Sequence, residues 1–207
     1  MVLVVILMFT RKQDFWTWFS RIAHQLAEKL DDPAMGNQLD KALRREIGDE
    51  LSWELGPLEG DRCYLAISPQ GDRSLLGEAE AFVATAPDIP GWKVLVGRQK
   101  KEFADNRLEM ELPELGTTEV GRWRFWLQKS AVLGRAAVVV FPAGAEKAPA
   151  DDLVACVEIV LDSLLGELTR IYAVDDFIVT RSVTDLQSGI QPLQLEGKLS
   201  EFLQQAQ

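Results

Sequence analysis

Three carboxylates and one tryptophan stand where side chains could line a small pocket. Glu54 lies in a predicted strand, Asp72 lies in a loop between a predicted strand and helix, and Glu167 lies late in an apolar helix. Trp92 follows a Pro-Gly turn. If the four residues converge, the carboxylates could perform acid–base chemistry or hold a ligand beside the indole ring. Nothing in their spacing requires convergence, and unrelated surface or capping carboxylates are the simpler interpretation.

Other catalytic and metal-binding patterns are absent from the sequence. The single histidine, His24, falls on the polar face of the first predicted helix and is interpreted as solvated. Cys63 and Cys156 are too few for a disulfide framework and lack zinc-site spacing, so we expect two buried, reduced thiols. No nucleotide-binding or hydrolase motif is present. Neighbouring carboxylates are interpreted as capping residues at element ends: Asp31/Asp32, Asp49/Glu50, Asp151/Asp152 and Asp175/Asp176. We therefore expect no catalysis, metal or cofactor.

The charge balance limits the partners that the chain can bind. A net charge of -10 argues against nucleic acids and against anionic membrane surfaces. Basic residues gather near tryptophans at 92–101 and 122–135, but we interpret them as the solvated face of half-buried strands. The acidity permits a basic protein partner, although solubility alone explains it.

Hydrophobic periodicity predicts the elements that must position these residues. An antiparallel helical pair is predicted at the N-terminus, over residues 13–30 and 33–47, with Gly48 as the stop of the second helix. Two further helices are predicted over 75–86 and 151–172. Alternating apolar residues predict a hairpin over 51–67. Later strands are predicted over 92–98, 108–112, 123–127, 136–141 and 177–179, with a turn over 116–121.

This order predicts an α+β fold. We expect a largely antiparallel sheet of about six to seven strands, with helices packed mainly on one face. The N-terminal helical pair precedes this sheet in the chain. Residues 136–141 are apolar on both faces, so they are predicted to form a central strand that is covered on both sides.

The length of 207 residues predicts one domain over 1–207. Residues 1–12 are expected to be a disordered or misassigned lead. Their apolar run, 2–9, is too short to span a bilayer, and is either an extra strand or arm, or a consequence of a natural start at Met8, which we favour. Residues 186–207 are expected to form a loosely attached tail, with a C-terminal helix from Glu196.

Four motifs together resemble a group of small bacterial proteins. They are Phe15-Trp16-Thr17-Trp18-Phe19, Ser68-Pro69-Gln70-Gly71-Asp72, Ala86-Pro87-Asp88-Ile89-Pro90-Gly91-Trp92 and Leu165-Gly166-Glu167. The resemblance runs over about residues 15–179. It implies a compact α+β domain and supplies no activity and no catalytic residues. It also implies an architectural role for Trp92 in its turn.

The sequence favours a non-enzymatic, cytoplasmic domain that binds another protein, in an immunity-like or regulatory role. One version is an immunity-like protein that masks a basic toxin surface, an analogy at the level of fold alone. The alternative is a small-ligand-binding protein or enzyme with a pocket lined by Glu54, Asp72, Trp92 and Glu167. A third hypothesis is a homodimer, paired through an edge strand or the apolar N-terminal run.

Overall fold

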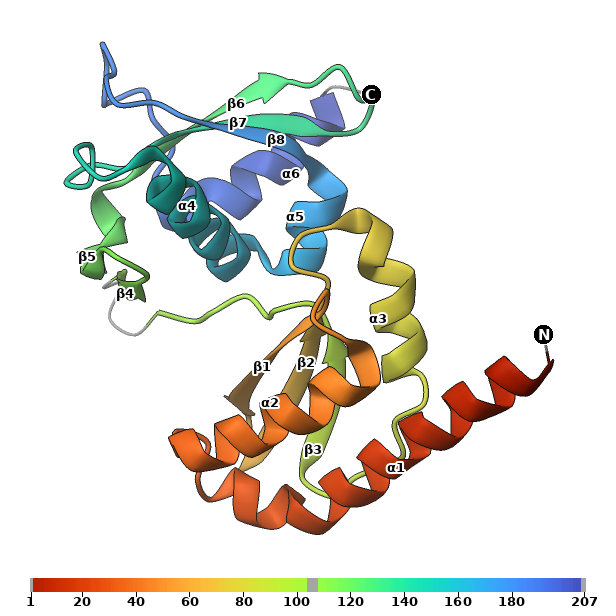
Figure 1. Ribbon diagram of the computed structural model, residues 1–207. Helices are drawn as coiled ribbons and strands as arrows, with labels where there is room; N and C mark the ends of the chain where they lie inside the picture. The colour runs from red at the N-terminus through yellow and green to blue at the C-terminus, as the bar shows by residue number, and fades with distance from the viewer. Residues whose placement is uncertain (1, 104–107, 206–207) are drawn as a thin grey trace. The chain divides into compact units, whose positions relative to one another are not determined.

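A computed structural model describes residues 2–103 and 108–205, with residues 2–14 described by their backbone alone. The chain forms two compact units, Met1–Arg98 and Gln99–Gln207, and each unit has a hydrophobic core of its own (Figure 1). The sequence predicted one domain over 1–207, and this stays a prediction.

Two helices open the first unit. Helix α1 (Val2–Ala27) starts earlier than predicted, so residues 2–9 are helical in their backbone and do not form an extra strand. The preference for Met8 as the natural start stays a prediction. Helix α2 (Pro33–Ile47) has its predicted bounds, because Asp32 caps its first turn and Gly48, at φ 71°, ends it. The residues at helical spacing are buried in the core as expected: Phe15, Phe19, Leu26, Met35, Leu39, Leu43 and Ile47.

A three-stranded sheet completes the first unit. Strands β1 (Ser52–Leu58) and β2 (Arg62–Ser68) form the predicted antiparallel hairpin. The chain then passes through a short 3₁₀ turn (Arg73–Leu75) and α3 (Leu76–Val83), and returns as β3 (Trp92–Val96), parallel to β2. Strand β2 is therefore central. Its residues Cys63, Leu65 and Ile67 share one core with the helices.

The second unit begins with a hairpin of β4 (Glu109–Leu112) and β5 (Gly116–Glu119). The turn predicted over 116–121 is wrong, because residues 116–119 pair with β4 and only Val120–Arg122 form a 3₁₀ turn. A second sheet follows, in the order β6 (Arg124–Lys129), β7 (Ala136–Phe141), β8 (Val174–Val179). Strand β7 is central as predicted, but only one of its faces is fully buried.

The expected large sheet of six to seven strands is wrong, although the α+β class is confirmed. The described residues form three sheets, of three, two and three strands. In both larger sheets an antiparallel hairpin is followed by a helical crossover and a strand parallel to the middle one, so each has the order β-β-α-β. A helical crossover allows parallel pairing, whereas alternation of apolar residues says nothing about which strands pair.

The helix predicted over 151–172 is two helices, α4 (Ala150–Leu165) and α5 (Glu167–Ala173). Gly166 divides them because its φ of 79° and ψ of 141° lie in a region that residues with a β-carbon avoid. The expected tail also packs. Helix α6 (Leu195–Gln205) follows a 3₁₀ turn (Pro192–Gln194) and buries Leu195 and Leu199 in the second core.

Candidate functional site

Glu54, the first predicted site residue, lies on β1 and binds its neighbour on β2. The hydroxyl of Tyr64 donates a hydrogen bond of 2.5 Å to Glu54 Oε1. Burial, followed by this carboxylate, raises the pKa of the Tyr64 phenol. The ring of Tyr64 lies so close to Gly56 that a β-carbon there would be 2.3 Å from Tyr64 Cε1. Glu54 therefore joins two strands.

Asp72 and Trp92 also have structural partners. Asp72 caps the 3₁₀ turn after β2, where the amide and hydroxyl of Ser74 each donate to Asp72 Oδ1 at 2.7 Å. The hydroxyl, followed by the amide, lowers the pKa of Asp72. Trp92 is buried, and its indole N–H donates to Ala23 O at 3.0 Å. Its ring meets Phe19 edge-on, with centroids 5.1 Å apart.

Glu167 belongs to the second unit. It is completely buried in the first turn of α5, one residue after the break in the helix. Nearby, Arg170 Nε donates to Asp162 Oδ1 at 2.5 Å, and both side chains are buried. Burial, the largest single effect, would lower the pKa of Arg170, but Asp162 together with the charges of Glu158 and Glu167 outweighs burial, so the pKa is raised. The convergence of Glu54, Asp72, Trp92 and Glu167 stays a prediction.

The described residues lack the features of a metal centre or a reactive nucleophile. No group of three or more His, Cys, Asp and Glu side chains that could hold a metal ion occurs among them. Burial raises the pKa of both thiols, Cys63 and Cys156, which makes them weak nucleophiles. His24 is exposed on α1, with Nδ1 3.6 Å from Glu28. In the same part of the chain, no helix is long and apolar enough to cross a membrane. The expected cytoplasmic location stays a prediction.

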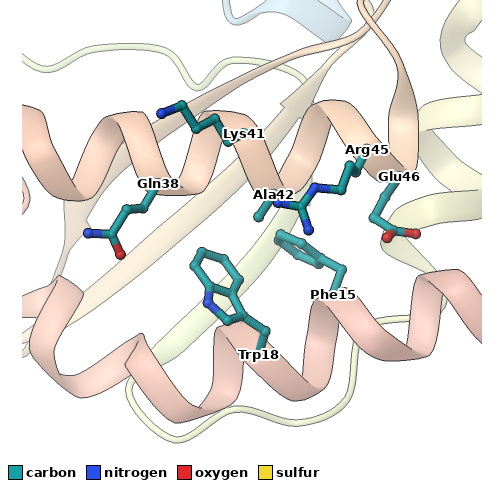
Figure 2. A pocket seen from close by; sticks show the side chains of 7 residues that line it. All are labelled: Phe15, Trp18, Gln38, Lys41, Ala42, Arg45 and Glu46. Atoms are coloured by element: carbon teal, nitrogen blue, oxygen red, sulfur yellow. The ribbon is translucent and has the colours of Figure 1, made fainter.

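A hollow of about 340 Å³ lies between α1 and α2 (Figure 2). Phe15 and Trp18 rise from α1 toward α2, and the Arg45 guanidinium reaches over the Phe15 ring. The side chains from α2 that complete the lining are Gln38, Lys41, Ala42, Arg45 and Glu46. We call this the helix hollow. The sequence analysis missed it because its shape depends on how α1 packs against α2, although the i, i+4 pair of cations was a visible signal.

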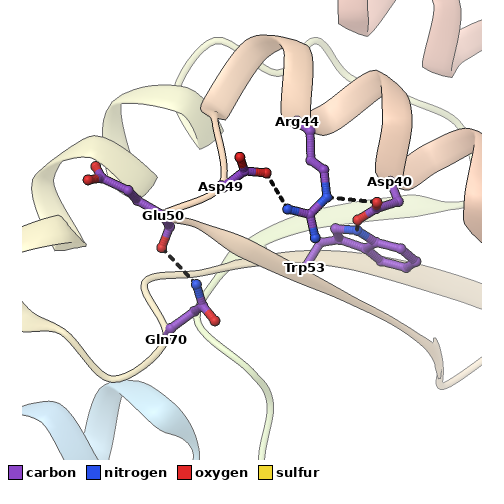
Figure 3. A network of polar contacts seen from close by, with 6 residues as sticks. All are labelled: Asp40, Arg44, Asp49, Glu50, Trp53 and Gln70. Carbon is purple, nitrogen blue, oxygen red and sulfur yellow. Dashed lines mark hydrogen bonds and ion pairs between the residues drawn. The ribbon is translucent and has the colours of Figure 1, made fainter.

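A polar network fixes the other side of α2 to the sheet (Figure 3). Asp40 accepts hydrogen bonds from Arg44 Nε at 2.8 Å and from the Trp53 indole N–H at 3.1 Å. Arg44 also pairs with Asp49. The bond from Arg44, followed by that from Trp53, lowers the pKa of Asp40. A smaller hollow of about 220 Å³ lies beside these residues. The charges of Asp40 and Arg44 that line it are already paired with each other.

The sheet of the second unit has one face that its helices leave open. Figure 1 shows α4, α5 and α6 on one side of β6, β7 and β8. On the opposite side, Trp126, Val139 and Ile178 are paired across the three strands and form one apolar row. Ile178 is 50% exposed. The loop over 180–188 borders this row and closes a hollow of about 460 Å³. We call this surface the outer face.

Sequence analysis missed the outer face because the strand order, which creates the row, was unknown. Alternation along β6 puts Trp126 on the face of the strand opposite to that of the buried Phe125. It could not show that Val139 and Ile178 would stand beside it.

Comparisons with known proteins give no assignment: no family model, no curated protein and no solved structure matches this chain. The resemblance to a group of small bacterial proteins therefore stays a prediction.

Proposed function

We propose that this protein is a non-enzymatic domain that binds a basic protein through the outer face of its β6–β7–β8 sheet. The observation that carries the proposal is the apolar row of Trp126, Val139 and Ile178. The residues on the inner side of the sheet belong to the core. On the other side, Figure 1 shows no helix among the described residues of this unit. Apolar patches of this kind, bordered by polar residues, are typical of protein interaction sites.

The charges around the row favour a basic partner. Asp176 lies on the same face one pair further along β8, and Asp185 lines the hollow beside the row. Both carboxylates are exposed. Arg124, on the same face of β6, hydrogen-bonds to backbone, because its Nη1 donates to Trp123 O at 2.7 Å and to Gly121 O at 3.2 Å. Together with a net charge of -10, this arrangement would steer a partner that carries Lys and Arg around an apolar ridge.

The edges of this sheet are poorer docking sites than its face. Ile190 forms a β-bridge to Phe125 beside β6, with N–H···O distances of 2.8 and 3.1 Å, so that edge is partly occupied. The other edge strand, β8, carries Asp175 and Asp176, and charged residues on an edge oppose pairing with a further strand. We therefore propose recognition by side chains on the face.

The test is affinity capture from a lysate of the producing organism, at low and high salt, with three versions of the full chain. Ile178→Lys places a charge in the row, and Ile178 is exposed enough for the fold to tolerate it. Leu133→Lys is the matched control, since Leu133 is 86% exposed on the turn between β6 and β7. The proposal expects a protein that wild type and Leu133→Lys retain at low salt, that high salt releases, and that Ile178→Lys loses.

Direct binding then gives the magnitude. A residue at the centre of an interface contributes more than about 1 kcal/mol, so Ile178→Lys should weaken the purified complex at least about fivefold. Equal capture by Ile178→Lys, or no capture by wild type, would refute the proposal. So would light scattering that shows a wild-type dimer which Ile178→Lys converts to monomer, because the partner would then be a second copy.

The alternative from the sequence, a pocket built by Glu54, Asp72, Trp92 and Glu167, is the weaker proposal. The described contacts of the first three side chains hold strands, a turn and a helix in place. Their chemistry is explained without a ligand.

A further inference from the structure

We propose that the helix hollow of the first unit binds a small carboxylate that carries an aromatic or aliphatic body. This site is separate from the outer face and goes beyond the proposed function. Its volume of about 340 Å³ falls within the range of small-molecule sites, about 300–1,000 Å³.

The floor of the helix hollow suits an apolar body. Phe15 is buried, and its ring centroid lies 5.8 Å from that of Trp18, with the planes tilted by 48°. Trp18 is half-buried and exposes part of its ring in the hollow, and Ala42 on α2 leaves room above it. Two tilted rings beside a small residue form a surface on which a flat or aliphatic group can pack.

The rim of the helix hollow suits an anion. Lys41 and Arg45 lie four residues apart on α2, a spacing at which like charges repel and destabilise a helix. Among the described residues, neither side chain has a hydrogen bond or ion pair, whereas the adjacent Arg44 is held by Asp40 and Asp49. Glu46 contributes one negative charge, so the lining has two cations, one anion and a net charge of +1. A carboxylate bound beside Arg45 would offset this positive charge and reduce its repulsion with Lys41.

Trp18 adds an indole N–H donor to the lining of the helix hollow. The N–H groups of Trp16, Trp53, Trp92 and Trp126 donate to Thr85, Asp40, Ala23 and Ser188. Among the described residues, the N–H groups of Trp18 and Trp123 have no acceptor. Trp123 is completely buried in the second core, whereas Trp18 lines the helix hollow. The site thus offers two cations and one neutral donor around an aromatic floor, which is the chemistry that distinguishes a carboxylate from an amide.

The test uses naphthalene-2-carboxylate as the probe and naphthalene-2-carboxamide as its uncharged counterpart. The readout is the indole N–H spectrum of the ¹⁵N-labelled full chain, with the Trp18 signal assigned from Trp18→Phe. We expect the carboxylate to shift the Trp18 signal saturably and to leave the Trp126 signal unchanged. We expect the carboxamide to bind up to about fivefold more weakly, since it cannot form an exposed ion pair, which is worth up to about 1 kcal/mol.

Variants decide whether the rim cations are responsible. Arg45→Gln should weaken carboxylate binding about fivefold, and its matched control Lys29→Gln, which removes one charge beyond the end of α1, should leave binding unchanged. Equal binding of carboxylate and carboxamide, or equal weakening by the two variants, would overturn the proposal. A Trp18 signal that stays fixed while others move would place the probe elsewhere and would also overturn it.

Discussion

The contact between Gly56 and Tyr64 allows a quantitative prediction about the first unit. A β-carbon at position 56 would lie 2.3 Å from Tyr64 Cε1 and 2.5 Å from its Cζ and hydroxyl oxygen, far inside contact distance. The backbone of Gly56 has an ordinary negative φ, so Gly56→Ala meets no backbone strain and acts through the ring alone. Tyr64 must therefore move, and its bond to Glu54 must break.

The magnitude combines two destabilising contributions and one stabilising contribution. Overpacking against a buried ring costs about 1–3 kcal/mol, and the lost hydrogen bond to a charged group costs about 1.5–3 kcal/mol. The lower entropy of alanine in the unfolded chain returns about 0.4–1 kcal/mol. We expect Gly56→Ala to lower the free energy of unfolding by about 2–4 kcal/mol.

The assay is urea unfolding of four chains: wild type, Gly56→Ala, Tyr64→Ala and the double variant. With the ring absent, alanine at position 56 should be neutral or slightly stabilising, so the coupling energy should be about 2–4 kcal/mol. The pKa of Tyr64 is raised in the wild type and should fall toward its ordinary value in Gly56→Ala. The reasoning is refuted if Gly56→Ala costs the same with and without the ring.

Three further predictions test other parts of the chain. The pKa of Asp40 is lowered in the folded state. Ionised Asp40 therefore stabilises the fold fully above the pKa that it has in the unfolded chain, and this stabilisation is lost as the pH falls through its folded pKa. Asp40→Asn should lower the free energy of unfolding by about 1 kcal/mol at neutral pH, measured by urea unfolding, and should have no effect in strong acid. Gly166→Ala should cost about 1–3 kcal/mol, measured the same way, because its φ of 79° strains any β-carbon; an unchanged midpoint would contradict this. Cys63 and Cys156 should react with a maleimide only on unfolding, as mass spectrometry of the native and denatured chain can check, and fast native labelling would contradict their burial.

Local structure was largely predictable from the sequence because its causes are local. Helix α2 has its capping residue, Asp32, and its terminating residue, Gly48, directly beside its two ends, and its bounds were predicted correctly. The pairing of strands was not predictable in this way. Parallel pairing of β3 with β2 and of β8 with β7 depends on where a helix returns the chain, which alternation does not encode. Gly166 lies within an apolar helical pattern, and that pattern alone does not show that the helix breaks there.

The two surfaces proposed as binding sites were beyond sequence analysis for the same reason. Trp18 and Arg45 share the helix hollow only because α1 packs against α2. Trp126 and Ile178 share the outer face only because β7 lies between their strands. In contrast, a carboxylate chosen from the sequence can have a partner close to it in the chain. Asp72, for example, accepts from the amide of Ser74, two residues later.

The β-β-α-β order has a consequence for synthesis of the chain. Strand β7 can pair with β6 as soon as both have been made, but its other edge waits until residues 142–179 have followed. At about 5–20 residues per second, that takes roughly 2 to 8 s. During this time the apolar segment Ala136–Phe141 has an open edge, which is the kind of segment that pairs with other chains. The nascent protein should therefore be most prone to aggregation, and most dependent on chaperones, just before β8 leaves the ribosome.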